Sequence, residues 1–175
     1  MSHPSAARAA PGLPLMKLSA GAVWPSAVAA ILVLLVGAIG FRMKQPWLFA
    51  GLAPSIFMVA NNPGQESSRV RAVVGGHLAA LACAYVALFL FTATGAWGLL
   101  AKLQVAPPRV WASAIALALL AFVQPQLRVY HPPAAATALL VTLGAYRLTG
   151  KTPLALMGGV VVIALASEVL QRVRR

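Results

Sequence analysis

The chain has 175 residues, of which 61% are hydrophobic and 9% charged, and its mean hydropathy is +0.85. A soluble domain of this size cannot bury so much apolar surface, so the composition predicts an integral membrane protein. Fourteen Lys and Arg residues oppose only two acids, Glu66 and Glu168. Because the basic residues lie mostly between the apolar runs, they indicate contacts with the lipid bilayer and argue against a nucleic-acid partner. The Ala-rich composition favours the bacterial inner membrane as the location.

Residues 1–21 are rich in Ala, Pro and Gly and predict a flexible tail ahead of a single helical transmembrane domain, 22–175. Six apolar segments follow, each bounded by charge, Pro or Gly: 22–41, 46–60, 72–92, 109–127, 132–146 and 152–171. Four of them approach the roughly 20 residues that a helix needs to cross the hydrocarbon core, whereas the second and fifth offer only about 15. The short segments are either half-membrane or re-entrant helices, or crossings that lean on their neighbours. The fold class is therefore an all-α integral membrane bundle.

The two halves of the domain, about 22–92 and 109–171, resemble each other in sequence. An alignment with one gap matches the first half to the second. It matches Arg42 with Arg128, Gln45 with His131, and Pro46 with Pro132. This pattern predicts a duplicated three-segment unit. If all three segments of each unit cross, the odd number makes an inverted repeat, in which transporters place their sites at the repeat interface. If the short segments are re-entrant, the halves run parallel.

A polar stretch that contains two prolines, RVYHPPAAATALL at 128–140, precedes the fifth segment. Proline suits the first turn of a helix, so this helix is expected to begin at Pro132 or Pro133. Its free backbone N–H groups and positive dipole end would then face His131 and Arg128 and form an anion site. Alternatively, the prolines only start a helix at the interface and Arg128 contacts lipid phosphate. The residues assigned to substrate binding are Arg128, His131, Pro132, Pro133 and Thr137, with Arg42 and Gln45 as counterparts in the first half.

Three ionisable residues, Arg71, His77 and Glu168, are candidates for a transport pathway or a proton relay. His77 follows Arg71 by six residues, which places it about 9 Å deeper if both lie on one helix. A histidine at that depth either serves the pathway or is a neutral side chain bonded to a backbone carbonyl. Glu168 either takes part in proton coupling or pairs locally with Arg172, four residues further on.

Two Gly-Gly pairs, at 75–76 and 158–159, predict the close approach of another helix. The sequence has no HExxH, GxSxG or P-loop motif and no cluster of metal-ligand residues, so we expect neither an enzyme nor a bound cofactor. Two alternatives stay open. In one, His77 and His131 are axial ligands of a haem in a membrane redox subunit. In the other, the protein is a structural membrane subunit.

Two stretches, RVYHPPAAATALL and GLAPSIFMVANNPGQESSRVRAVVGGH, resemble the HPP family of integral membrane proteins, which occurs in bacteria and in plastids. The resemblance extends from about Trp24 to the end of the chain, and Arg71 is the residue carried over from the positions that precede Gly-Gly-His in the family. Cyanobacterial and chloroplast members are implicated in nitrite transport. The resemblance therefore implies transport of a small monovalent anion, above all nitrite. We also expect a homo-oligomer, because so small a bundle encloses little space.

Overall fold

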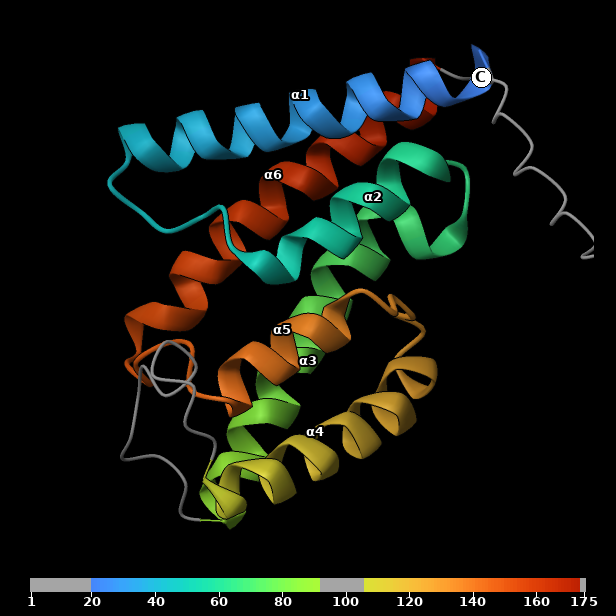
Figure 1. The fold of residues 1–175 in the computed structure, drawn as a ribbon. Helices are drawn as coiled ribbons and strands as arrows, with labels where there is room; N and C mark the ends of the chain where they lie inside the picture. The colour runs from blue at the N-terminus through green and yellow to red at the C-terminus, as the bar shows by residue number, and fades with distance from the viewer. Residues whose placement is uncertain (1–19, 92–105, 174–175) are drawn as a thin grey trace, which may run out of the picture.

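The computed structural model describes residues 20–91 and 106–173, which form helices and no strand (Figure 1). The elements in chain order are α1 (Ala20–Arg42), η1 (Ala50–Leu52), α2 (Ala53–Asn61), η2 (Glu66–Ser68), α3 (Val70–Leu90), α4 (Pro107–Gln126), α5 (Ala134–Thr142) and α6 (Lys151–Val173). In the described part of the chain, α1, α3, α4 and α6 are long and apolar enough to cross a membrane. The all-helical membrane fold is therefore confirmed. The predicted tail lies outside the described residues except for Ala20 and Gly21, which already belong to α1.

The second and fifth segments are short helices, as predicted, and each follows a non-helical stretch. After α1 the chain runs without helix from 43 to 49, and after α4 it does so from 127 to 133. The second residue of each stretch, Lys44 in one and Arg128 in the other, is in the left-handed region at φ 54°. The next amide then bonds back into the preceding helix, from Gln45 N to Gly40 O at 2.9 Å and from Val129 N to Gln124 O at 3.0 Å. The same turn therefore reverses the chain ahead of each short helix.

This shared turn corrects the sequence alignment between the halves. By hydrogen-bond pattern Arg128 corresponds to Lys44 and not to Arg42, which is the last residue of α1. The sequence alignment was guided by the prolines, whereas the turn is fixed by the left-handed residue that follows the helix end. The duplication itself stays a prediction.

The bundle has two ends, and the hydrogen bonds show which loops meet at each. At the end where α6 terminates, the carbonyl of Ser68 accepts hydrogen bonds from Ser167 Oγ and Gln171 Nε2. Arg71 Nη2 donates to the carbonyl of Leu127 at 3.1 Å, which brings the end of α4 to the same place. We call this the terminal end, because α1 also begins there beside the last turns of α6.

The opposite end holds the loops after α1 and α5. There Arg109 Nη1, in the first turn of α4, donates to the carbonyl of Thr142 at the end of α5, at 2.8 Å. Gln45 and Pro46 line one pocket together with Lys151, the first residue of α6. Hence each short helix, together with the non-helical stretch before it, leads from one end to the other, and the six segments alternate in direction (Figure 1). The re-entrant alternative does not match this arrangement.

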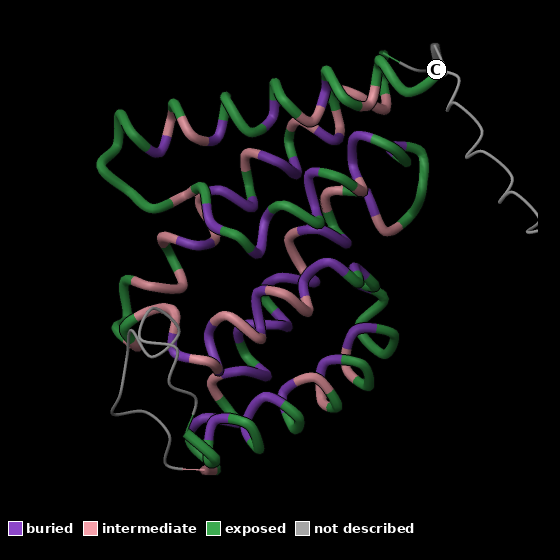
Figure 2. Tube along the Cα trace, in the orientation of Figure 1, coloured by how far each residue is buried: buried purple, intermediate pink, exposed green. Residues whose placement is uncertain are grey.

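Helix α3 is the centre of the bundle and packs against α4, α5 and α6. Figure 2 shows buried residues concentrated on α3, α5 and the facing sides of their neighbours, whereas α1 is largely exposed. The exposed side chains of α1 are apolar, including Ile31, Leu34 and Phe41. Such a surface suits a helix that faces lipid.

Both Gly-Gly pairs make the predicted close contacts, but loops approach them and not helices. A Cβ atom on Gly76 would lie 2.6 Å from Cβ of His131, and one on Gly75 would lie 2.5 Å from the Val129 side chain. In the other half, Gly158 and Gly159 are covered by the ring and backbone of Trp47. The stretches 127–133 and 43–49 therefore dip into the bundle because the glycines leave room for them.

Candidate functional site

A chain of hydrogen bonds joins two buried histidines in the interior of the bundle. Nε2 of His77 and Nε2 of His131 lie 3.0 and 2.9 Å from the same atom, Oγ of Ser55. Nδ1 of His77 lies 2.8 Å from Oγ1 of Thr137, and Nδ1 of His131 lies 2.7 Å from the carbonyl oxygen of Ser67. The four side chains of Ser55, His77, His131 and Thr137 are at most 1% exposed. We call this row, from Thr137 to the Ser67 carbonyl, the histidine chain.

Each member of the histidine chain comes from a different part of the fold, so its hydrogen bonds can form only when these elements are packed together. Ser55 lies in α2, His77 in α3 and Thr137 in α5, while His131 lies in the stretch ahead of α5. His77 is seven residues beyond the start of α3, which corresponds to about 10 Å of helix. The structure buries the His77 imidazole in the interior of the bundle, and its partners are hydroxyl groups and not a backbone carbonyl.

The donors and acceptors of the chain have one consistent order when both imidazoles are neutral. A carbonyl can only accept, so Nδ1–H of His131 donates to Ser67 and its Nε2 accepts from the Ser55 hydroxyl. The Ser55 oxygen then accepts from Nε2–H of His77, whose Nδ1 accepts from the Thr137 hydroxyl. All ring nitrogens are satisfied, which offsets the cost of burying them.

Gln124 fixes the backbone of His131. Its Oε1 accepts from the His131 amide at 3.2 Å, and its Nε2 donates to the His131 carbonyl at 3.2 Å and to the Gly76 carbonyl at 3.4 Å. A single buried amide thus ties the irregular stretch to α3 and α4.

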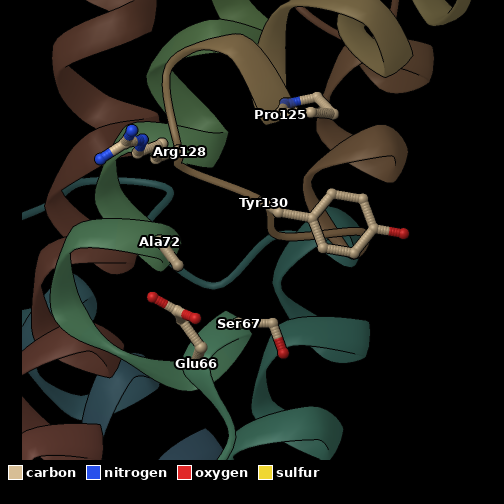
Figure 3. Close-up of a pocket in the computed structure, with 6 residues that line it drawn as sticks. All are labelled: Glu66, Ser67, Ala72, Pro125, Arg128 and Tyr130. Atoms are coloured by element: carbon tan, nitrogen blue, oxygen red, sulfur yellow. The ribbon is translucent and has the colours of Figure 1, made fainter.

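A cavity of about 290 Å³ opens at the terminal end of the bundle, and Ser67, where the histidine chain ends, is one of its lining residues. Figure 3 shows Glu66 and Ser67 from η2 on one side of it, and Arg128 and Tyr130 from the stretch after α4 on the other. The Arg128 side chain is exposed, so it belongs to the entrance and not to the buried site. Arg128 and His131 therefore do not form one compact site as predicted, because Arg128 lies at the mouth of the cavity and His131 lies in the interior.

The start of α5 does not offer the free N–H groups expected from sequence. The amides of Ala134, Ala135 and Ala136 donate to the carbonyls of His131, Pro132 and Pro133, at 3.0 to 3.1 Å. The helix begins one residue later than predicted, at Ala134, because both prolines lie in the turn before it. The prolines supply no N–H of their own, and the turn uses the next three, so this terminus has no spare donors for an anion.

A second cavity, of about 220 Å³, lies at the opposite end and is lined by Gln45, Arg147 and Lys151 among others. Tyr146 also lines it and makes an edge-to-face contact with Phe49, with ring centroids 6.3 Å apart. Behind these rings lies Gly51, where a Cβ would be 2.8 Å from the Phe49 ring and 2.9 Å from Oγ1 of Thr137. The histidine chain thus begins behind this aromatic pair and ends at the cavity of the terminal end.

Four further predicted site residues lie outside the histidine chain. Arg42 is exposed at the end of α1 and is absent from both cavity linings. Glu168 forms an ion pair with Arg172 at 3.4 Å on α6, which matches its local alternative. Gln45 lies at the opposite end, and Arg71 holds the end of α4 beside the mouth.

Sequence reasoning missed Ser55, Ser67 and Gln124. Ser55 carried one signal, since it is a polar residue within an apolar run and directly follows Pro54. Ser67 contributes its backbone carbonyl, which no side-chain motif reports.

The histidines do not fit a haem. Both Nε2 atoms already share Ser55 Oγ, both rings are fully buried, and their centroids are 5.3 Å apart. Two axial ligands must face opposite sides of one iron with the macrocycle between them, and Ser55 occupies that space. No cluster of three potential metal ligands occurs among the described residues.

Comparison with known proteins identifies the family to which the transmembrane region belongs. The profile of the family described as HPP, transmembrane region, matches residues 16–175. No curated protein and no solved structure matches the chain.

Proposed function

The chain belongs to the HPP family of membrane proteins, and from this membership and the geometry of the histidine chain we propose that it transports a small monovalent anion, nitrite foremost, across the membrane. The observation that carries the proposal is the histidine chain itself. Buried polar groups are costly inside a membrane protein and tend to mark a substrate or ion path. This row of groups lies between two cavities at opposite ends of the bundle.

Each part of the path has a role in the proposal. Arg128 attracts the anion to the terminal mouth, and Arg147 and Lys151 do so at the opposite mouth. Inside, the imidazoles of His77 and His131 and the hydroxyls of Ser55 and Thr137 take the place of water around the anion, and to do so they exchange hydrogen bonds of the histidine chain for hydrogen bonds to the anion. The Phe49–Tyr146 pair closes the path at the opposite end and has to move during transport.

Uptake into proteoliposomes, measured for nitrite, nitrate, formate and chloride in turn, tests the proposal. We expect saturable uptake of at least one of these anions above the rate in protein-free liposomes. A structural subunit would carry none of them, and its His77→Gln and His131→Gln variants would behave as the wild type in every assay. Absence of uptake for the whole panel would contradict the transport proposal.

We also propose that the protein is a homo-oligomer in the bacterial inner membrane and that it catalyses no reaction.

The role of Arg128 at the mouth is tested by Arg128→Gly. Glycine relieves the left-handed backbone at φ 54°, so the variant should fold as well as the wild type. An exposed charge contributes about 0.5 to 1 kcal/mol, so the half-saturation concentration should rise about two- to fivefold at low ionic strength.

Lys44→Gly is the matched control, because Lys44 has the same φ in the corresponding turn and lines neither cavity. We expect its half-saturation concentration to equal that of the wild type. Equal values for both variants would show that Arg128 only contacts lipid.

A further inference from the structure

We infer that the anion crosses together with one proton, and that this proton passes between the imidazoles of His77 and His131 through the hydroxyl of Ser55. The inference rests on the proposed function and adds its coupling. Ser55 is the bridge because its Oγ is the one atom within hydrogen-bond distance of both imidazoles among the described contacts.

The first argument is charge balance. An anion in this enclosure loses its hydration, and a buried charge needs an opposite charge nearby. In the described part of the chain, the imidazoles hydrogen-bond to hydroxyls and to one carbonyl, and to no charged side chain. A proton taken up by an imidazole supplies the missing positive charge.

The charged groups on the surrounding elements lie at the ends of the bundle. At the terminal end, Glu66 of η2 and Arg128 line the mouth, and Arg71 of α3 is bonded to the Leu127 carbonyl. At the opposite end, Arg109 of α4 is bonded to the Thr142 carbonyl. On α6, Glu168 pairs with Arg172.

From α4 the side chain that reaches the histidine chain is Gln124, a neutral amide that holds the backbone of His131. Among the described residues, the two imidazoles are therefore the basic side chains of the interior path.

The second argument is the order of donors along the chain. When Nδ1 of His77 takes up a proton, its Nε2–H bond can break and the proton can pass to Oγ of Ser55. The Ser55 O–H bond breaks in turn, and that proton forms a new N–H bond at Nε2 of His131. One proton enters and one positive charge appears on His131, while each heavy atom stays at its hydrogen-bond distance of 2.8 to 3.0 Å. The Ser67 carbonyl, which accepts from Nδ1–H of His131, stabilises the cation that results.

Two consequences distinguish this coupling from a channel. One monovalent anion and one proton carry no net charge, so a membrane potential should not change the rate. A pH gradient, by contrast, should drive uptake, and uptake should acidify the lumen by about one proton per anion.

The experiment uses the full chain in proteoliposomes that contain a fluorescent pH indicator. Potassium with valinomycin sets the potential, and each of nitrite, nitrate, formate and chloride is supplied in turn, with protein-free liposomes as the background for undissociated acid. We expect lumenal acidification together with anion entry, a rate that ignores the imposed potential, and slower transport in deuterium oxide. Anion entry without acidification, at a rate that follows the potential, would overturn the coupling and leave the proposed function intact. Uptake of none of the anions would overturn both.

Three variants locate the relay. Ser55→Ala removes the bridge and should lower coupled uptake about a hundredfold, as expected when a positioned proton donor and acceptor is lost. Ser55→Thr keeps the hydroxyl and should restore the proton-to-anion ratio and the isotope effect. Ser26→Ala is the matched control, since Ser26 Oγ bonds to the Ala22 carbonyl of its own helix and is exposed. Wild-type rates and ratios in folded Ser55→Ala would overturn the relay. If that variant does not fold, loss of the ratio or of the isotope effect in folded Ser55→Thr would overturn it.

Discussion

At the scale of single residues, Gln124 holds the backbone of His131 in place. Its amide group makes the hydrogen bonds that a neighbouring strand or helix would otherwise provide to the backbone of His131. A buried stretch without secondary structure needs such a partner, because unpaired backbone groups are costly away from water. The position of the imidazole therefore depends on a residue that does not touch the ring.

Gln124→Ala should destabilise the protein by about 1 to 3 kcal/mol, because it leaves the amide of His131 without a partner in a buried site and leaves its carbonyl with the Ala134 amide as donor. The measurement is thermal or chemical unfolding in detergent. Gln126→Ala is the control, since Gln126 is exposed two residues further along the same helix and should change stability by less than about 0.5 kcal/mol. Equal stability of the two variants would show that His131 is held by other contacts.

Ser55 and Thr137 illustrate how far residue types alone predict a site. The sequence indicated His77, His131 and Thr137 because ionisable and polar residues stand out in apolar helices. It paired the two histidines only as possible ligands of a haem, because they are 54 positions apart and meet through a third element. A single serine in an apolar run has no periodicity or spacing that reports its partners, so the bridge required the three-dimensional structure.

At the scale of elements, the short helices depend on what precedes them. The 15-residue apolar segments predicted short helices correctly, but a non-helical stretch leads into each helix and packs on glycines of a long helix. The sequence indicated the glycines and expected a helix to approach them. A loop approaches instead, because the left-handed residue after the preceding helix turns the chain inward before the next helix starts.

Gly76→Ala tests this contact. Its Cβ would lie 2.6 Å from Cβ of His131, so the stretch 127–133 or α3 has to shift. Overpacking of this kind costs about 1 to 3 kcal/mol, and the displaced imidazole should also lose its bond to Ser55, which lowers anion uptake.

Gly64→Ala is the control for that substitution, since no heavy atom lies within 4 Å of its Cβ position. We expect wild-type unfolding temperature and uptake for Gly64→Ala, and a loss of both for Gly76→Ala. A Gly76→Ala variant as stable and active as the wild type would mean that the loop does not pack as closely as the structure describes.

At the scale of the whole molecule, hydropathy predicted the helices but not their directions. Lys and Arg residues are divided almost evenly between the two ends, so the sequence left the path of the short segments open. The contacts decide it, because Ser68 meets the last turns of α6 and Thr142 meets the first turn of α4. Each short helix and the stretch before it thus connect opposite ends, and the path between the two mouths follows from that arrangement.

Single cysteines provide a test of this topology in a membrane. Cys83 is the one cysteine of the sequence and is buried, so Cys83→Ala supplies a background for labelling with a membrane-impermeant thiol reagent. Gly64→Cys and Gly150→Cys place thiols in the loops after α2 and after α5, at positions with open space around the Cβ. Gln126→Cys adds a third site at the end of α4.

If α2 and α5 cross, Gly64→Cys and Gln126→Cys should react from one side of the membrane and Gly150→Cys from the other, because the first two positions lie at the terminal end. If the short helices turned back instead, all three loops would lie on the same side and label together. The two topologies therefore give different labelling patterns in sealed vesicles of known orientation, without any assumption about the transported anion. Labelling of all three cysteines from one side would contradict the alternation of the six segments, and with it the path from one mouth through the histidine chain to the other.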